Sequence, residues 1–503
     1  MKYQKQAILR QTAGLLTCIL LLSALFGCAE AEPVQTSHSE AATSATVLTP
    51  PDAAVSTLFG IPYVAGRRIN PITETVQENR DVHTLLFDPL FRVNAAFQAE
   101  PAICASVETE NNTLVLNLRQ DVVFHDGSRL SAKDVLYSLN LAREQEGSAY
   151  RDRFAGVEAM EADGSFRVRL TLSAAHPSLP ALLDIPILKS GTGVDNDAVG
   201  SGRYCVMESD GQSYLVPNTT HYSGQSGAAQ MTHLLLVDVS DAEALVYGAL
   251  SGNLGVLRPS AAGSDISLHS NADRYRIRTT ELVYVGFRVT SGLFADADVR
   301  RAAAAWLAEA RPGGSDLSDA GRLYPAALGY DLPDTEPVPA AFSAEGNVRL
   351  LISADAPNDV RAAAEAVQLR LESAGLTVEW VEKTATSYET ALRNGAFDLY
   401  VGSWDVGADF DFRGLLASGG SQNRTGSGST TLDGLLTAYV RAGTADGEML
   451  ARQIEAAADE LAAIVPLGYR YEEMLVNRRF GIRNVRPVAD DLFDNIYDWI
   501  CER

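Results

Sequence analysis

Cysteine is scarce in this chain of 503 residues, which contains only five. Cys18 and Cys28 lie near the N-terminus, so Cys104, Cys205 and Cys501 remain for the rest of the chain. One disulfide among these three is possible and none is required, and no C-x-x-C pair or His-Cys cluster has metal-ligand spacing. We therefore expect these cysteines to be buried as small apolar residues, and we expect no metal site and no cofactor. Stability must come from core burial, and 46% hydrophobic residues suffice for two or three domains.

Positive charge is also in short supply. The chain has 41 Lys and Arg residues against 64 Asp and Glu residues, a net charge of −23 at pH 7. Such a charge opposes binding to polyphosphates, so we expect no nucleic acid partner. It adds a weak preference for cationic ligands, although its main effect is solubility.

The common catalytic motifs are missing. The sequence contains no G-x-S-x-G, H-E-x-x-H, G-x-x-x-x-G-K-[ST] or C-x-x-C pattern. These absences favour a binding protein over an enzyme. Pairs of Asp and Glu occur throughout so acidic a chain, so a two-carboxylate hydrolase stays as an alternative.

The N-terminus has the layout of an export signal. Lys2, Lys5 and Arg10 precede an apolar stretch at 13–26, which is shorter than the roughly 20 residues of a spanning helix. The stretch ends at Leu25-Phe26-Gly27-Cys28, which resembles a bacterial lipobox and predicts a signal peptide at 1–27 with Cys28 acylated. The alternative is a secreted protein cleaved at an ordinary site nearby. Residues 28–52, rich in Ala, Glu, Ser and Thr, are expected to be a flexible tether.

Strands and helices alternate along the chain, which predicts an α/β fold. Residues 348–353 are typical of a buried strand, a helix with one apolar face follows, and a second strand begins after Gly375. This β-α-β order implies parallel pairing. Upstream, Asp126-Gly127 predicts a tight turn, and Ser131 with Asp134 forms a capping box before a helix.

One long segment resembles a known family. Residues 112–119 and 122–139 are similar to the signature of the oligopeptide, dipeptide and nickel class (bacterial family 5) of extracytoplasmic solute-binding proteins of ABC importers. Shorter pieces follow in the family's order: Leu86-Phe87-Asp88-Pro89-Leu90, Gly200-Ser201-Gly202-Arg203-Tyr204, Asn218-Thr219-Thr220-His221-Tyr222, Asp298-Val299-Arg300-Arg301-Ala302 and Phe397-Asp398-Leu399-Tyr400. The resemblance therefore covers most of the chain.

The resemblance implies a two-lobed periplasmic-binding-protein-like fold with a hinge and an extra small domain. Its expected divisions are lobe I at 53–79 and 189–281, the small domain at 80–188, lobe II at 282–475, and a return to lobe I at 476–503. The chain would cross between lobes near 282–288 and 476–482. Such proteins close over a ligand in the interlobe cleft.

The resemblance also implies a function. It predicts a lipid-anchored monomer at the outer face of the cytoplasmic membrane, which captures a small, peptide-like ligand and delivers it to the permease subunits of an ABC transporter. Relatives of the family take peptides, nickel complexes, sugars or other solutes, so the ligand itself stays open. A surface peptide receptor or sensor without a transport role is the second alternative.

Two departures from the family pattern concern the site. Gly200-Ser201-Gly202-Arg203-Tyr204 replaces the frequent Gly-Thr-Gly-Pro-Tyr, and residues 404–412 replace Trp-x-Ala-Asp-Tyr-x-Asp-Pro with altered spacing and no proline. By position in this second motif, Asp409 is the candidate carboxylate for a peptide's α-amino group, and Asp405 is the alternative. Trp404 is expected either to form an apolar wall of the site or to pack in the core.

Other candidate contacts come from two segments. Thr75 and Gln77 lie in a segment that the family places at the cleft, and Asn423 lies in a Ser/Gly-rich loop. Arg424 or Arg413 could hold a ligand carboxylate bidentately. The alternative for all five is an ordinary solvated surface.

Overall fold

The computed structural model describes residues 58–259, 271–308, 310, 317–333, 342–442 and 444–502. The predicted leader, tether and Cys28 lie outside these ranges. The fold described here is that of the unit at 52–503. Within the described residues, no helix combines the length and apolar character needed to cross a bilayer.

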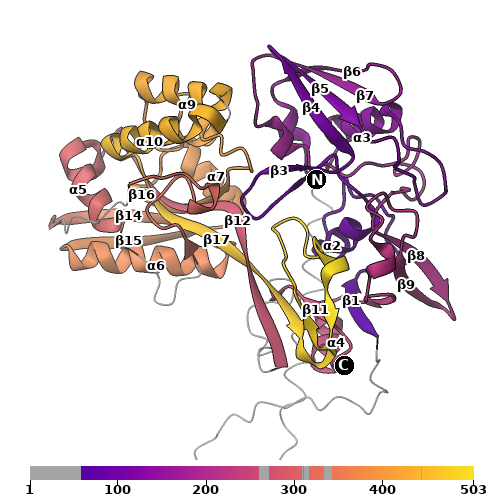
Figure 1. Ribbon diagram of the computed structural model, residues 1–503. Helices are drawn as coiled ribbons and strands as arrows, with labels where there is room; N and C mark the ends of the chain where they lie inside the picture. Colours follow the sequence, from indigo (N-terminus) through magenta and orange to yellow (C-terminus); the bar gives the residue numbers. More distant parts are fainter. Residues whose placement is uncertain are drawn as a thin grey trace, which may run out of the picture. The chain divides into compact units, whose positions relative to one another are not determined.

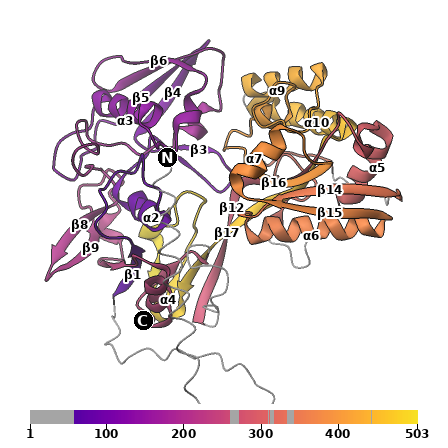
Figure 2. The same cartoon turned by 180° about the vertical axis from the view of Figure 1, so that it is seen from behind.

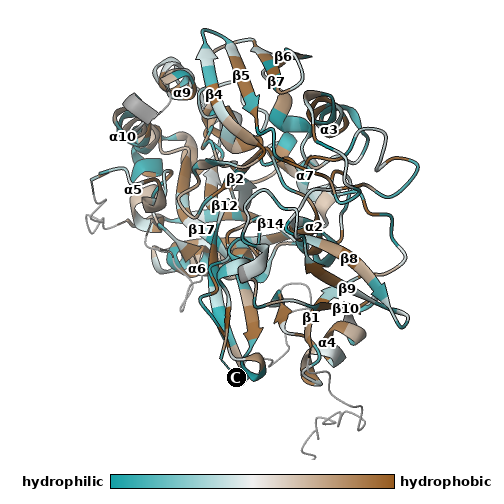
Figure 3. Cartoon of the chain, turned by 45° about the vertical axis from the view of Figure 1, so that its right-hand side comes forward, coloured by the Kyte–Doolittle hydropathy of each residue, from teal (hydrophilic) through white to brown (hydrophobic). Residues whose placement is uncertain are grey.

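Residues 104–172 form a four-stranded antiparallel sheet of strand order β4-β5-β7-β6, beside α3 (Figure 1). The elements are β4 (Cys104–Glu110), β5 (Thr113–Leu118), α3 (Ala132–Glu144), β6 (Val157–Ala162) and β7 (Arg167–Leu172). Hydrophobic residues run through β5 (Figure 3), where Leu114, Val115 and Leu116 are buried. A short hairpin, β2 (Phe91–Val93) with β3 (Ala99–Pro101), precedes this sheet.

The local signals predicted for this region are confirmed. Gly127 has φ +84° and its N–H donates to the Phe124 carbonyl at 2.8 Å, so Asp126-Gly127 is a tight turn. The Asp134 carboxylate accepts from the Ser131 backbone N–H at 2.9 Å, which closes the capping box at the start of α3.

The turn at Gly127 yields a stability prediction. A β-carbon there would meet no atom within 4 Å, so the cost of a side chain is the left-handed backbone alone. We expect Gly127→Val to lower the free energy of unfolding by more than about 1 kcal/mol in urea titrations. Gly434→Ala is the matched control, because Gly434 lies in a helix with open space around it, and alanine there should stabilise by up to about 1 kcal/mol. Equal midpoints for Gly127→Val and the parent would contradict the prediction.

A second sheet has the strand order β1-β10-β9-β8, with β1 parallel to β10 and the other pairs antiparallel. Its strands are β1 (Phe59–Tyr63), β8 (Tyr204–Ser209), β9 (Gln212–Pro217) and β10 (Leu234–Asp238), and its neighbours are α2 (Gln77–Leu86) and α4 (Ala242–Leu250). A small ladder of β18 (Ile482–Arg483) with β19 (Ile500–Cys501) ends the chain.

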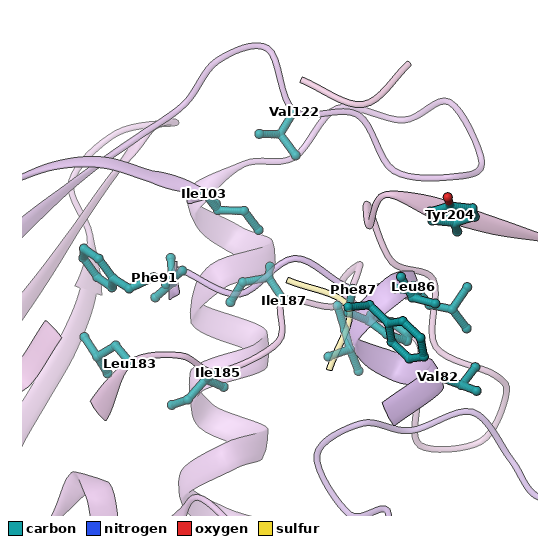
Figure 4. Packing of buried hydrophobic residues seen from close by; sticks show 14 of the residues in the cluster. Val82, Leu86, Phe87, Phe91, Ile103, Val122, Leu183, Ile185, Ile187 and Tyr204 are labelled. Atoms are coloured by element: carbon teal, nitrogen blue, oxygen red, sulfur yellow. The ribbon is translucent and has the colours of Figure 1, made fainter. Parts of the chain in front are cut away.

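One hydrophobic cluster joins these two sheets to the C-terminal segment, and we call this part of the chain the first lobe. The cluster contains Leu85 and Leu86 of α2, Ile185 and Ile187, and Phe493. Figure 4 shows members from α2 and from residues 183–187 packed together. The shared core makes the small sheet of β4–β7 part of this lobe.

The second lobe is built on a seven-stranded sheet of order β11-β17-β12-β16-β14-β15, with β13 on β17. Its strands are β11 (Val256–Leu257), β12 (Ala272–Phe287), β13 (Leu317–Ser318), β14 (Gly346–Ser353), β15 (Leu376–Lys383), β16 (Leu399–Asp405) and β17 (Ile464–Asn477). Its helices are α5 (Ala297–Leu307), α6 (Asn358–Ser373), α7 (Ala385–Arg393), α8 (Arg413–Leu416), α9 (Thr430–Ala442) and α10 (Thr444–Leu461). β14 and β15 pair in parallel and α6 connects them, so the predicted β-α-β unit is confirmed.

Helices cover both faces of this sheet because its side chains alternate between two cores. Val283, Val285 and Phe287 of β12 point into the cluster formed with α5 and α6, whereas Leu282 and Tyr284 belong to the cluster formed with α9 and α10. Figure 2 shows α6 on one side of β14 and β15, with α9 and α10 on the other.

β12 and β17 connect the two lobes. They pair along most of their length, with a register shift between Arg278 and Leu282. Ile277 and Met474 belong to the first-lobe core, whereas Leu282 and Tyr469 belong to the second. Each strand therefore passes from one core to the other at mid-length. The residue boundaries that the resemblance implies for the domains stay predictions.

The structure decides whether a disulfide forms among Cys104, Cys205 and Cys501. Cys104 and Cys205 carry free thiols, and burial raises the pKa of Cys104 to about 12. The Cys501 sulfur lies 3.5 Å from the sulfur of Met231. Because any pair among the three cysteines would need Cys104 or Cys205, none of the possible disulfides forms.

Candidate ligand-binding cleft

A cleft of about 1270 Å³ lies between the lobes. Its floor is the stretch where β12 and β17 pass from one core to the other, and includes Arg278, Glu281 and Glu472. Its walls come from segments 93–97, 149–155 and 181–184 of the first lobe, from 404–411 of the second, and from 487–490 near the C-terminus. Typical small-molecule sites measure about 300–1,000 Å³, so this cleft has room for a ligand of several residues.

The loop that follows β16 forms the second-lobe wall. The Asp405 Oδ1 atom accepts hydrogen bonds from the Thr280 hydroxyl at 2.6 Å and from the Gly407 N–H at 3.0 Å. The Phe410 N–H donates to the Gly407 carbonyl at 3.2 Å. Phe410 is buried with its ring centroid 5.3 Å from that of Phe97, at the turn of the β2–β3 hairpin. The loop is thus fixed at both ends and the carboxylate of Asp409 sits within it.

Asp409 lines the cleft and contacts the opposite lobe. Its carboxylate Oδ2 lies 3.1 Å from Nε2 of His176, which follows β7 of the first lobe. The two side chains are 6% and 16% exposed. In the structure, the carboxylate predicted to receive a ligand amine therefore has a partner from this chain, and that partner bridges the two lobes.

Trp404 and Asp405 also line the cleft. Trp404 is half-buried, packs against the second-lobe core, and has its ring centroid 6.5 Å from that of Phe412. It thus lies both against the core and in the lining of the cleft, and a contact between Trp404 and a ligand stays a prediction. Asp405 is held to β12 by Thr280, which leaves it less available to a ligand than an unpaired carboxylate.

The structure places the other five candidates outside the lining of the cleft. Arg413 pairs with Asp411 through its Nε and Nη2 atoms, at 2.9 and 2.6 Å. Arg424 lies 3.5 Å from Glu389. The Asn423 amide donates to two carbonyls of its own loop, at 2.9 and 3.0 Å.

The two candidates near the start of α2 also have local partners. Thr75 is exposed and its N–H donates to the Glu74 carboxylate. Gln77 donates to Asp81 at 3.0 Å and lines a smaller recess instead of the cleft. A ligand role for these residues stays a prediction.

Several charged residues of the cleft have no signal in the sequence. Glu472 is held by Arg258. Burial raises the pKa of Glu472, Arg258 opposes that rise and the negative charge of Asp490 adds to it. Burial likewise raises the pKa of Asp184, which pairs with Arg153 and also faces Asp490. The cleft thus contains carboxylates that interact with one another, and Asp184 lies about 300 residues from Glu472 and Asp490 in the sequence.

A recess of about 110 Å³ extends from the cleft into the first lobe. The cleft and the recess share seven lining residues, which are Arg80, Val93, Tyr150, Arg153, Asp184, Val488 and Asp490. The recess is further lined by His83 of α2 and by the aromatic rings of Phe87 and Phe91. In the described parts of the chain, no group of three His, Cys, Asp or Glu side chains is placed to hold a metal ion.

Two lobes, two connecting strands and a cleft between them define the fold of a periplasmic-type solute-binding protein. Residues 98–307 match the family model described as "Bacterial extracellular solute-binding proteins, family 5 Middle". The predicted resemblance to this class is therefore confirmed. A curated relative, Protein XP55 of Streptomyces lividans, is 26% identical over 239 residues, a match that covers 44% of this chain and 43% of that protein's length.

Solved structures extend the likeness of fold over nearly the whole described chain. The structure described as HbpA2 from Haemophilus parasuis has a TM-score of 0.72 and 16% identity, covering 89% of this chain and 100% of that one. A putative peptide binding protein, AppA from Clostridium difficile, has a TM-score of 0.67 and 17% identity, covering 88% and 100%. The predicted α/β two-lobed fold is confirmed, and these named neighbours are similar in fold.

Proposed function

We propose that the chain is the solute-binding component of an ABC importer, which captures a peptide-like ligand in the interlobe cleft and delivers it to membrane permease subunits. The observation that carries this proposal is the position of the cleft, whose floor is the pair of strands that connects the lobes. A ligand that touches both walls stabilises the closed arrangement by its difference in affinity for the two states. A permease then distinguishes loaded from empty protein.

The shape and chemistry of the cleft support a peptide. Main-chain groups of an extended ligand form hydrogen bonds that do not depend on side-chain identity, and a cleft of about 1270 Å³ accommodates several residues. Asp409 would hold the α-amino group, with Trp404 as an apolar contact beside it. The C. difficile neighbour, described as a putative peptide binding protein, agrees with this class of ligand.

The experiment is mass spectrometry of whatever co-purifies with the protein from its native cells, followed by calorimetry with trialanine. Bound peptides and saturable trialanine binding are the expected results. Peptide returned unchanged after prolonged incubation supports a binding protein, whereas cleavage would favour the two-carboxylate hydrolase. Loss of peptide uptake in a deletion strain separates an importer from a surface sensor, in which uptake would persist. A co-purified ligand that is not a peptide would overturn the proposed class.

The proposed location depends on Cys28. If Cys28 is acylated, Cys28→Ala should release the protein from membranes, because residues 28–52 contain little apolar surface to replace the lipid. Fractionation and immunoblotting of cells that express either form measure this. Cys205→Ala is the matched control and should stay with the membrane, since that thiol lies on β8 within the folded unit. A Cys28→Ala variant that remains membrane-bound would contradict the anchor.

A further inference from the structure

The recess beside the cleft contains a buried histidine without a partner. His83 is only 7% exposed, and its Nδ1 atom has no hydrogen-bond partner among the described residues. Burial lowers the pKa of His83 to about 4, so the imidazole is neutral at pH 7 and has a nitrogen that can accept a hydrogen bond. A buried polar atom without a partner is costly, and His83 is one of the residues that line the recess.

The charges that line the recess favour a cation. Five carboxylates face it, against three guanidinium groups. Most of these charges are already paired, some with residues outside the lining: Asp184 with Arg153, Asp81 with Arg258, Asp491 with Arg203, and Arg92 with Asp88 at 2.9 Å. Asp490 differs, because its carboxylate has no hydrogen bond or ion pair within the described chain, and it lies at the mouth, where recess and cleft meet. Arg80 lies at the same mouth and opposes a cation, but over the recess as a whole the carboxylates outnumber the guanidinium groups.

The walls between these groups suit the stem of a long side chain. Phe87, Phe91 and Val488 offer apolar surface, on which the methylenes of a lysine or arginine side chain can pack. Tyr150 lies with its ring 4.9 Å from the Arg153 guanidinium, so the recess already contains one cation–aromatic contact.

We propose that this recess is a subsite for the ammonium or guanidinium group of a ligand side chain, held between the Asp490 carboxylate at its mouth and the His83 imidazole within. The subsite would make the protein selective for peptides with a basic residue. This inference rests on the proposed peptide function and deepens it, because the cleft alone gives no preference among side chains.

Calorimetry with two tripeptides tests the subsite. Ala-Lys-Ala and Ala-norleucine-Ala share a four-carbon side-chain stem and differ in the ammonium group. We expect the lysine peptide to bind the parent protein about tenfold more tightly or better. Asp490→Asn should reduce this ratio below about threefold, while Asp498→Asn, an exposed carboxylate of the same segment that pairs with Arg486, should preserve it.

The outcomes separate the subsite from the peptide function. Equal affinity of the two peptides for the parent protein would overturn the subsite, indicating a recess filled by water, and leave peptide binding intact. No binding of either peptide would overturn the peptide function.

A second measurement, on the ring nitrogens of His83, then decides on the subsite alone. Their ¹⁵N signals, assigned by their loss in His83→Gln, should shift on titration with n-butylammonium and not with 1-butanol. The absence of a shift would overturn the subsite as well.

Discussion

Asp409→Asn should weaken the binding of trialanine by about 30-fold to several thousand-fold. The substitution keeps the size of the side chain and removes the charge that makes its hydrogen bond to an ammonium group strong. The Asp409 side chain is only 6% exposed, and loss of one member of a buried charged pair costs about 2–5 kcal/mol of binding free energy. Each tenfold change in the dissociation constant corresponds to about 1.4 kcal/mol, which gives the expected range. A carboxylate that does not meet the ligand would change the affinity less than about threefold.

A double-mutant cycle with N-acetyl-trialanine assigns the contact. Acetylation should weaken binding to the parent strongly and to Asp409→Asn hardly at all, a non-additivity expected only of direct partners. His176→Ala is the matched control, because it removes the partner seen in the structure and keeps the carboxylate, so sensitivity to acetylation should persist. Equal weakening of parent and Asp409→Asn would contradict the contact, and Asp405 would be tested next.

The elements predicted correctly have signals within a few residues of one another. The β-α-β unit at 346–383, the turn at Gly127 and the capping box at Ser131 each depend on periodicity or on local turn chemistry, which a sequence displays directly. The pairing of β1 with β10 joins residues about 175 apart, and β12 with β17 about 190 apart. Apolar alternation predicts strands but does not say which strand is the neighbour, so these pairings had no local signal.

The candidate site likewise contains residues that a local sequence signal could predict and residues that have no such signal. Trp404 and Asp405 end β16 and Asp409 lies in the loop that follows, so one motif could place all three at the cleft together. Arg413 and Arg424 are candidates because a guanidinium group suits a carboxylate, and in the structure they pair with the nearby carboxylates of Asp411 and Glu389. The recess brings His83 of α2 beside residues 488–494. Residues about 400 apart that meet only in the folded chain leave no pattern for sequence reasoning to find.

The change from proline to Arg203 in the glycine-rich motif has a structural reason that the sequence did not suggest. Gly202 packs against the end of α2, where a β-carbon would approach the Leu86 carbonyl carbon to 2.3 Å, so the two family motifs meet there. The Arg203 guanidinium, 4% exposed, donates to the Phe493 carbonyl at 2.8 Å and pairs with the carboxylate of Asp491. It therefore ties the C-terminal segment, which carries the carboxylates of the recess, to the first lobe.

Arg203→Met should lower the free energy of unfolding by about 3–5 kcal/mol, because it leaves the largely buried Asp491 carboxylate without its closest cation. Urea titration measures the loss as a lower midpoint at unchanged slope. Arg486→Met, an arginine 67% exposed in the same segment, is the matched control and should cost less than about 0.5 kcal/mol. Adding Asp491→Asn to Arg203→Met should recover part of the loss, since the amide oxygen can still accept from Thr84 and Phe493 and the charge that Arg92, at 3.6 Å, would otherwise pair with alone is removed. A double variant no more stable than Arg203→Met alone would show that the ion pair is not what holds this segment.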